Sequence, residues 1–172
     1  MPDFSYIGRG QVLVKEYGAV GTGTFIGDVS VLQLKFTEDV KTLEDFTQVG
    51  GGTYNEVRRI QSVELACTVH DFSPGNLAMA LYGTSTLASG TDTIQALVNA
   101  AKEYDVVFNG LNEARSGKAV TFHGFRWKMG PAATIDLIGN DFGKLDLTGK
   151  LLADQTITTA GLSKYFVMTV LE

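Results

Sequence analysis

The residues best suited to catalysis or metal binding are two histidines and one cysteine, and their spacing favours neither role. His70 and His123 lie in strand-like stretches, without the i, i+4 helical pairing or the CxxC partner of a zinc site. Asp71 follows His70, but adjacent strand residues point to opposite faces, which disfavours a base with its orienting carboxylate. Cys67 falls on an apolar strand face, so we interpret it as a buried small hydrophobe and not as a reactive thiol.

Three glycine-containing stretches carry pieces of nucleotide-binding motifs without their context. Gly21 and Gly23 lie between two strand patterns with no helix behind them, so we interpret them as a turn. Asp141-Phe142-Gly143 lacks the remaining kinase signatures, and 139–144 lacks the spacing of a phosphate-binding loop. The carboxylates are scattered and suggest no acid–base pair. We predict that the protein is not an enzyme and uses no cofactor and no metal.

Length and composition indicate one domain spanning 1–172. A chain of 172 residues buries roughly 70% of its unfolded surface. Its 20 glycines and 3 prolines suit a β protein with many turns. The net charge of −5 argues against a protein that grips nucleic acid by neutralising phosphates. No signal peptide and no run of about 18 apolar residues is visible, which predicts folding in the cytoplasm without a membrane partner.

The stretch from Arg58 to Gly83 is predicted to form a long strand followed by a short helix. Its first half alternates, with four apolar residues on one face: Val63, Leu65, Cys67 and Val69. Ser73 is a suitable N-cap and Pro74 a suitable first helical residue, which predicts a helix over about 74–82. Its packing residues are expected to be Leu77, Leu81 and Tyr82.

The fold class predicted is mainly β: an antiparallel β-sandwich or barrel with this one flanking helix and a long inter-strand loop over 38–55. Further strands are expected over 11–17, 24–36, 104–108, 119–129, 142–154 and 164–171, the first two forming a hairpin and the last being buried. A bulge is expected at Gly124, where the apolar phase shifts. The segment 84–91 reads as a linker, and 92–104 is ambiguous between helix and extended chain, with a slight preference for helix.

The loop 38–55 is predicted to be an arm that becomes ordered against a neighbouring subunit, the alternative being a flexible surface loop. It is long, it mixes charges with apolar residues, and such loops are usually functional or disordered. The residues expected to make contacts between subunits are Val40, Lys41, Leu43, Glu44, Asp45, Phe46, Val49 and Tyr54.

Four stretches together resemble the tail tube proteins of long-tailed phages. They are the S-P-x-N-L-A-x-A-L-Y-G segment at 73–83, Gly8-Arg9-Gly10 before a strand, the segment 25–29 and the segment 142–147, and they are spread over most of the chain. The resemblance implies a virion protein of the non-contractile tail, assembled in the host cytoplasm, whose hexameric rings stack into a tube for DNA ejection. It also implies that the loop 38–55 reaches the adjacent ring.

The resemblance further implies partners and an inner surface. Besides its own copies, the partners would be tail tip or initiator proteins, tail terminator proteins and a tape measure protein inside the tube. Genomic DNA would pass without specific binding. The polar face opposite Val63 and Leu65 would line the lumen, with Ser62, Glu64 and Thr68 as candidates.

Two other functions remain open from the sequence. A carbohydrate- or protein-binding β-sandwich would need aromatic side chains exposed on one strand face, and Phe125 and Trp127 share a face with Met129. The second is the tube protein of a contractile injection system, which would form rings by the same interactions.

Overall fold

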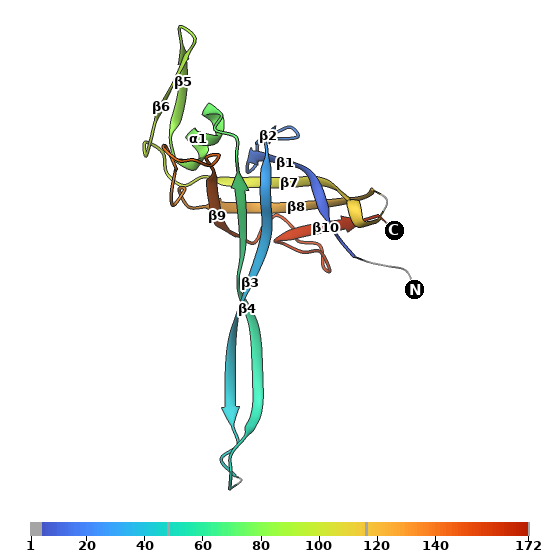
Figure 1. Cartoon of the computed structure of the whole chain (residues 1–172). Coiled ribbons are helices and arrows are strands. Elements are labelled where there is room, and N and C mark those ends of the chain that lie inside the picture. Colours follow the sequence, from blue (N-terminus) through green and yellow to red (C-terminus); the bar gives the residue numbers. More distant parts are fainter. Residues whose placement is uncertain (1–4, 48, 116, 172) are drawn as a thin grey trace.

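The computed structural model describes residues 5–47, 49–115 and 117–171 and confirms the mainly β fold class, with antiparallel strands and one short α-helix in this part of the chain (Figure 1). The strands are β1 (Gly8–Glu16), β2 (Thr24–Phe25), β3 (Val29–Glu44), β4 (Thr53–Val69), β5 (Thr84–Ala88), β6 (Thr91–Gln95), β7 (Glu103–Asn112), β8 (Lys118–Met129), β9 (Leu145–Leu151) and β10 (Phe166–Val170). The helices are α1 (Pro74–Ala80) and a 3-10 turn, η1 (Glu113–Arg115). Within the described residues, neither is long and apolar enough to cross a membrane.

One bent sheet forms the body of the molecule. Its described strands run in the order β2-β1-β7-β8-β9-β4-β3, and β10 pairs with the free side of β8. Strands β3 and β4 cross β1, β7 and β8 (Figure 1). The apolar faces of the two crossing parts meet, as in an orthogonal sandwich that is open on one side.

The core lies between these crossing parts and follows the alternation of the sequence. Val63, Leu65, Cys67 and Val69 of β4 are all buried, as predicted, and so are Leu145, Leu147 and Leu151 of β9. Trp127 is fully buried among them, and its Nε1 donates a hydrogen bond to the Leu65 carbonyl at 3.2 Å. The exposed aromatic platform that a carbohydrate-binding strand needs is therefore not formed by Trp127.

The predicted helix is present, although it ends at Ala80 instead of residue 82. Ser73 is its N-cap and accepts a hydrogen bond from the Asn76 amide at 3.4 Å. Leu77 and Met79 pack against the core, whereas Leu81 and Tyr82 lie beyond the last helical residue and are half-buried. Tyr82 donates a hydrogen bond to the Met129 carbonyl, which fixes the end of α1 to β8.

The segment from 84 to 104 differs from the prediction. Instead of a linker and a helix, β5 and β6 form a separate hairpin that projects beyond α1, and Leu97 sits in a left-handed turn at φ 59° (Figure 1). Ile94, Leu97 and Val98 have helical spacing, but Thr91–Gln95 is held extended by pairing with Thr84–Ala88. Tertiary and cross-strand pairing override a weak helical pattern here.

The predicted loop 38–55 is also corrected, because most of it is strand. β3 continues to Glu44 and β4 starts at Thr53, so only the turn between them is irregular. Both faces of this hairpin are exposed, which removes the apolar–polar alternation by which strands are recognised. A bulge between Thr37 and Glu38 marks where the hairpin leaves the body.

Two details of pairing differ from or refine the expected ones. β1 pairs with the two-residue β2 but not with β3, so the predicted hairpin over 11–36 is wrong in its second strand. The phase shift in β8 is confirmed: Gly124 pairs with Val106 and Trp127 with Tyr104, which leaves one extra residue on β8 just after Gly124.

A buried carboxylate fastens the loop after β9 to the sheet. Asp154 accepts hydrogen bonds from the Tyr17 hydroxyl at 2.9 Å and from the Thr156 hydroxyl at 2.7 Å. Arg126 lies over the Tyr17 ring, 5.1 Å from its centroid, and donates to the Ala153 carbonyl. The Thr156 hydrogen bond is the main cause of the lowered pKa of Asp154, and Tyr17 adds to it.

We expect Asp154→Asn to reduce the acid sensitivity of the fold. Because its native pKa lies below the unfolded value near 4, ionised Asp154 stabilises the fold above about pH 4, and this contribution is lost as pH falls through the native pKa. The substitution should cost on the order of 1 kcal/mol at pH 7 and less at pH 2. Urea unfolding midpoints between pH 7 and pH 2 measure this, and an unchanged pH profile would contradict it.

Candidate functional site

The residues suited to catalysis are not brought together. The His70 ring nitrogen Nε2 lies 2.9 Å from the Ser30 hydroxyl, and His123 packs edge-on against Phe125 with 4.8 Å between ring centroids. Among the described residues, no group of three or more histidines, cysteines and carboxylates is arranged to hold a metal ion. The structure therefore directs attention to surfaces and not to a reactive centre.

Cys67 is buried, as predicted, and burial raises the pKa of its thiol to about 12. A thiol of that pKa is ionised at pH 8 to only about one part in ten thousand, and the thiolate is the reactive form. We expect the folded protein to react with a thiol reagent such as DTNB at least a hundredfold more slowly than the protein in guanidinium. Equal rates in the two conditions would contradict burial of Cys67 in β4.

The outer part of the β3–β4 hairpin, residues 38–60, is the most conspicuous surface feature, and we call it the arm. It extends away from the body, on the side opposite the β5–β6 hairpin (Figure 1). Seven strand residues per side, Glu38–Glu44 in β3, reach about 23 Å. A two-stranded hairpin that is covered on neither face is at best marginally stable in water. Its geometry therefore leaves both faces of the arm open for contact with another molecule.

The arm carries every residue that the sequence analysis assigned to contacts between subunits. Phe46 at the tip is 83% exposed, and Leu43 and Tyr54 are also exposed. The tip is ordered by Asp45, whose carboxylate accepts hydrogen bonds from the amide and hydroxyl of Thr47 at 2.8 and 2.6 Å. These hydrogen bonds lower the pKa of Asp45.

Ion pairs stiffen the stem of the arm. Arg58 lies between Glu56, with Nε 2.5 Å from its carboxylate, and Glu38, 3.3 Å away on the opposite strand. Lys41 pairs with Asp39 at 3.3 Å. Because these groups are exposed, each pair adds little stability. The apolar side chains Leu43, Phe46 and Tyr54 nevertheless remain exposed.

Three strand edges are free within the described part of the chain. β3 pairs only with β4, β10 pairs only with β8, and β1 pairs with β2 only at Leu13 and Val14 on its outer side. The last strand was predicted to be buried, but Met168 is 53% and Val170 56% exposed. This prediction is wrong because β10 is an edge strand that is exposed on both faces beyond Phe166. Such edges are templates for pairing with another chain.

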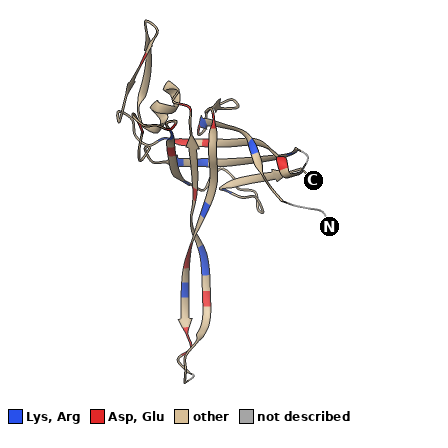
Figure 2. Cartoon of the chain, in the orientation of Figure 1, with Lys and Arg blue, Asp and Glu red and all other residues tan. Residues whose placement is uncertain are grey.

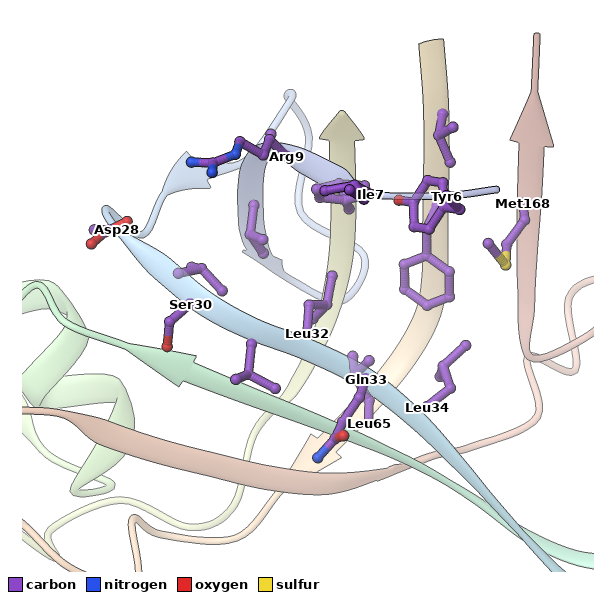
Figure 3. Close-up of a pocket in the computed structure, with 18 residues that line it drawn as sticks. Tyr6, Ile7, Arg9, Asp28, Ser30, Leu32, Gln33, Leu34, Leu65 and Met168 are labelled. Carbon is purple, nitrogen blue, oxygen red and sulfur yellow. The ribbon is translucent and has the colours of Figure 1, made fainter. Parts of the chain in front are cut away.

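A groove of about 930 Å³, lined by both apolar and polar side chains, opens between two of these edges. It runs under β3, between β3 and the start of β1, and β10 borders it (Figure 3). Leu32 and Leu34 of β3 point into it, opposite Ile7 before β1 and Met168 of β10 (Figure 3). The groove is where the two halves of the sandwich fail to close, since no strand joins β1 to β3 in the described chain.

The predicted lumen candidates lie together on the outer face of β4. Ser62, Glu64 and Thr68 are half-buried and alternate with the core residues of the same strand. Thr68 donates a hydrogen bond to Asp146 of β9 at 2.7 Å, which is the main cause of the lowered pKa of Asp146. The structure brings these residues onto one face, together with Asp146 of β9.

The fold and these surfaces define an antiparallel β protein with one short α-helix, two projecting hairpins and free strand edges in its described part. Family comparison is more specific. A family model described as "Protein of unknown function UCP028589" matches residues 5–93 and 87–169. The matches span nearly the whole chain, so the chain belongs to this family. No curated protein matches the chain.

Proposed function

We propose that this chain is the tube subunit of a long, non-contractile phage tail, which assembles into hexameric rings that stack around the path of the DNA. The observation that carries the proposal is the combination of free strand edges that carry apolar side chains with a projecting arm that has exposed apolar residues at its tip. The resemblance of the 73–83 segment and of three other stretches to tail tube proteins supports the choice of this assembly.

Ring closure follows from the two unlike edges. β3 and β10 lie at different borders of the body. If β3 of one copy pairs with β10 of the next, the interface is heterologous, and such interfaces close into a ring when the rotation between copies fits. A closed ring of sheets removes exposed edges altogether. The exposed Val167 and Met168 on β10 would then be covered by the neighbour.

Stacking is assigned to the arm. It projects well beyond the body, so it is long enough to contact a copy outside its own ring (Figure 1). Its exposed tip residues, Phe46 and Tyr54, supply apolar contact area, and the Asp45 turn holds them in place before contact. Contact with a second copy would stabilise this otherwise marginal hairpin.

The polar outer face of β4 and β9 is proposed to line the lumen. The face with Ser62, Glu64 and Thr68 is half-buried and polar, which suits contact with water and passing DNA. The proposal extends to a virion location, and to tail tip, tail terminator and tape measure proteins as partners, on the strength of the resemblance alone.

Negative-stain electron microscopy, together with the mass from size-exclusion chromatography at low and high concentration, tests the proposal. Six-fold rings or hollow tubes are the expected result. A monodisperse monomer at every concentration, also with tail-tip extract, would overturn it and favour a β-sandwich binding module. Tubes that recruit a contractile sheath would instead assign the chain to an injection system.

A further inference from the structure

A row of charged side chains crosses the polar face of the sheet. The strand registers pair Lys35 with Glu64, Glu64 with Lys150, Lys150 with Lys128, and Lys128 with Glu103. Directly paired residues of antiparallel strands point to the same face. The five side chains therefore form one stripe over β3, β4, β9, β8 and β7, which spans about 19 Å at the usual strand spacing.

The stripe has an uncompensated positive charge. Glu103 is neutralised by Arg126 at 2.8 Å, and nearby Asp146 by Lys144 at 3.1 Å. Within the described residues, Lys35, Lys128 and Lys150 form no ion pair, and Glu64 is the one carboxylate among them that is also unpaired. Charged residues of both signs are visible where β9 and β4 meet β7 and β8 (Figure 2). A basic stripe thus lies on a chain whose net charge is −5.

The centre of the stripe is unfavourable for the isolated chain. Lys128 and Lys150 are directly opposite each other and exposed, while their neighbours Trp127, Met129 and Leu151 are buried. Like charges in directly opposite positions of a sheet destabilise it. An anion placed between the two ammonium groups would remove this repulsion.

We propose that the Lys35–Lys128–Lys150 stripe binds the phosphate backbone of nucleic acid. Phosphate contacts need lysines supported by small polar side chains, and Gln33, Thr37, Ser62 and Thr148 surround the stripe on the same face. The binding is electrostatic and independent of base sequence, because lysines that contact phosphates do not read base edges.

An acidic protein segment fits this face less well. Protein interfaces are centred on aromatic, methionine and other apolar anchors. On this face the side chains near the three lysines are polar or small. One of the small residues is Ala66, which lies opposite Thr148. The large exposed apolar side chains lie mainly elsewhere, on the arm, on β10 and in loops such as 137–142. The polar surroundings of the stripe favour a polyanion on this face.

The proposal that the stripe binds nucleic acid depends only on the stripe itself. The location of the stripe inside a tube rests on the proposed function. In a six-fold ring the stripe would repeat as a basic belt around the lumen. It would give the DNA weak, rapidly exchanging contacts and would replace the purely non-binding lumen expected from the sequence. Glu64, between Lys35 and Lys150, limits the strength of these contacts.

The test is fluorescence anisotropy of a labelled 30-base-pair DNA duplex with the lowest-mass species of the full-length chain from size exclusion. Three phosphate contacts predict an affinity loss of about 40-fold between 50 and 200 mM salt. In K128Q/K150Q, with one contact left, the loss should be only about 4-fold, with weaker binding at low salt. The control K118Q/K164Q changes the net charge equally, at positions outside the stripe, and should bind as wild type. Glu64→Gln should bind more tightly.

The outcomes separate this proposal from the tube. No binding of wild type at 50 mM salt, or equal binding by K128Q/K150Q and its control, would overturn the stripe even if tubes form. Tighter binding of poly-glutamate than of DNA would assign the face to an acidic protein and also overturn it. Stripe-dependent DNA binding by a chain that never forms rings would support the stripe and overturn the tube.

Discussion

Replacing Trp127 by alanine is expected to destabilise the protein by about 3–5 kcal/mol, the usual cost of removing a fully buried large aromatic side chain. Trp127 is 0% exposed, and it packs where the two crossing halves of the sheet meet. Its Nε1 bonds the Leu65 carbonyl, so the substitution also removes a buried donor. The loss is comparable with the whole stability of many domains.

The fit around Trp127 extends to Gly149 on β9. A Cβ at position 149 would lie 2.7 Å from Nε1 of Trp127 and 2.4 Å from the Lys128 carbonyl oxygen, so glycine is required for β8 and β9 to approach closely. Because of this close approach, the Trp127 indole packs directly against the backbone of β9.

Urea unfolding followed by circular dichroism measures the effect, since Trp127 is the one tryptophan and its fluorescence is lost. Trp127→Phe keeps an aromatic ring but not the donor, and we expect a loss of about 1–3 kcal/mol. This variant gives a graded answer if Trp127→Ala does not fold. A change below 1 kcal/mol in both variants would contradict the described core.

The central strand and helix were predictable because local pattern and tertiary structure agree there. Residues 63–69 alternate because one face of β4 is buried and the other is polar. Ser73 is the N-cap of α1 and Pro74 is its first residue, which are positions that these residue types favour. An element can be predicted from the sequence where its local pattern and its tertiary structure agree in this way.

The parts that could not be predicted depend on pairing that has no local signal. An arm exposed on both faces has no alternation, and 84–95 is a hairpin only because β5 finds β6. β10 alternates like a buried strand, and only its position at the border of the sheet exposes Met168 and Val170. The stripe was missed for the same reason: Lys128 and Lys150 are far apart in sequence and adjacent in register.

Removing the arm is expected to abolish stacking while leaving the body folded. Glu38 pairs with Ile60, so replacing residues 39–59 by Asn-Gly closes the hairpin with a two-residue turn at a natural pairing position. The buried core contains no residue of the removed segment among those described. We therefore expect the melting temperature to change by only a few degrees. Rings, by contrast, should no longer form tubes in electron micrographs.

A finer variant separates the apolar tip from the presence of the arm. F46A/Y54A removes the two aromatic side chains at or next to the turn but keeps the hairpin, and we expect at least a tenfold rise in the concentration needed for tubes. F46Y/Y54F keeps both rings and should assemble as wild type. If the shortened chain or F46A/Y54A still forms tubes at wild-type concentrations, stacking does not depend on the arm. Contacts between rings would then have to lie on the body, with the β5–β6 hairpin as the next surface to alter, because it projects on the opposite side.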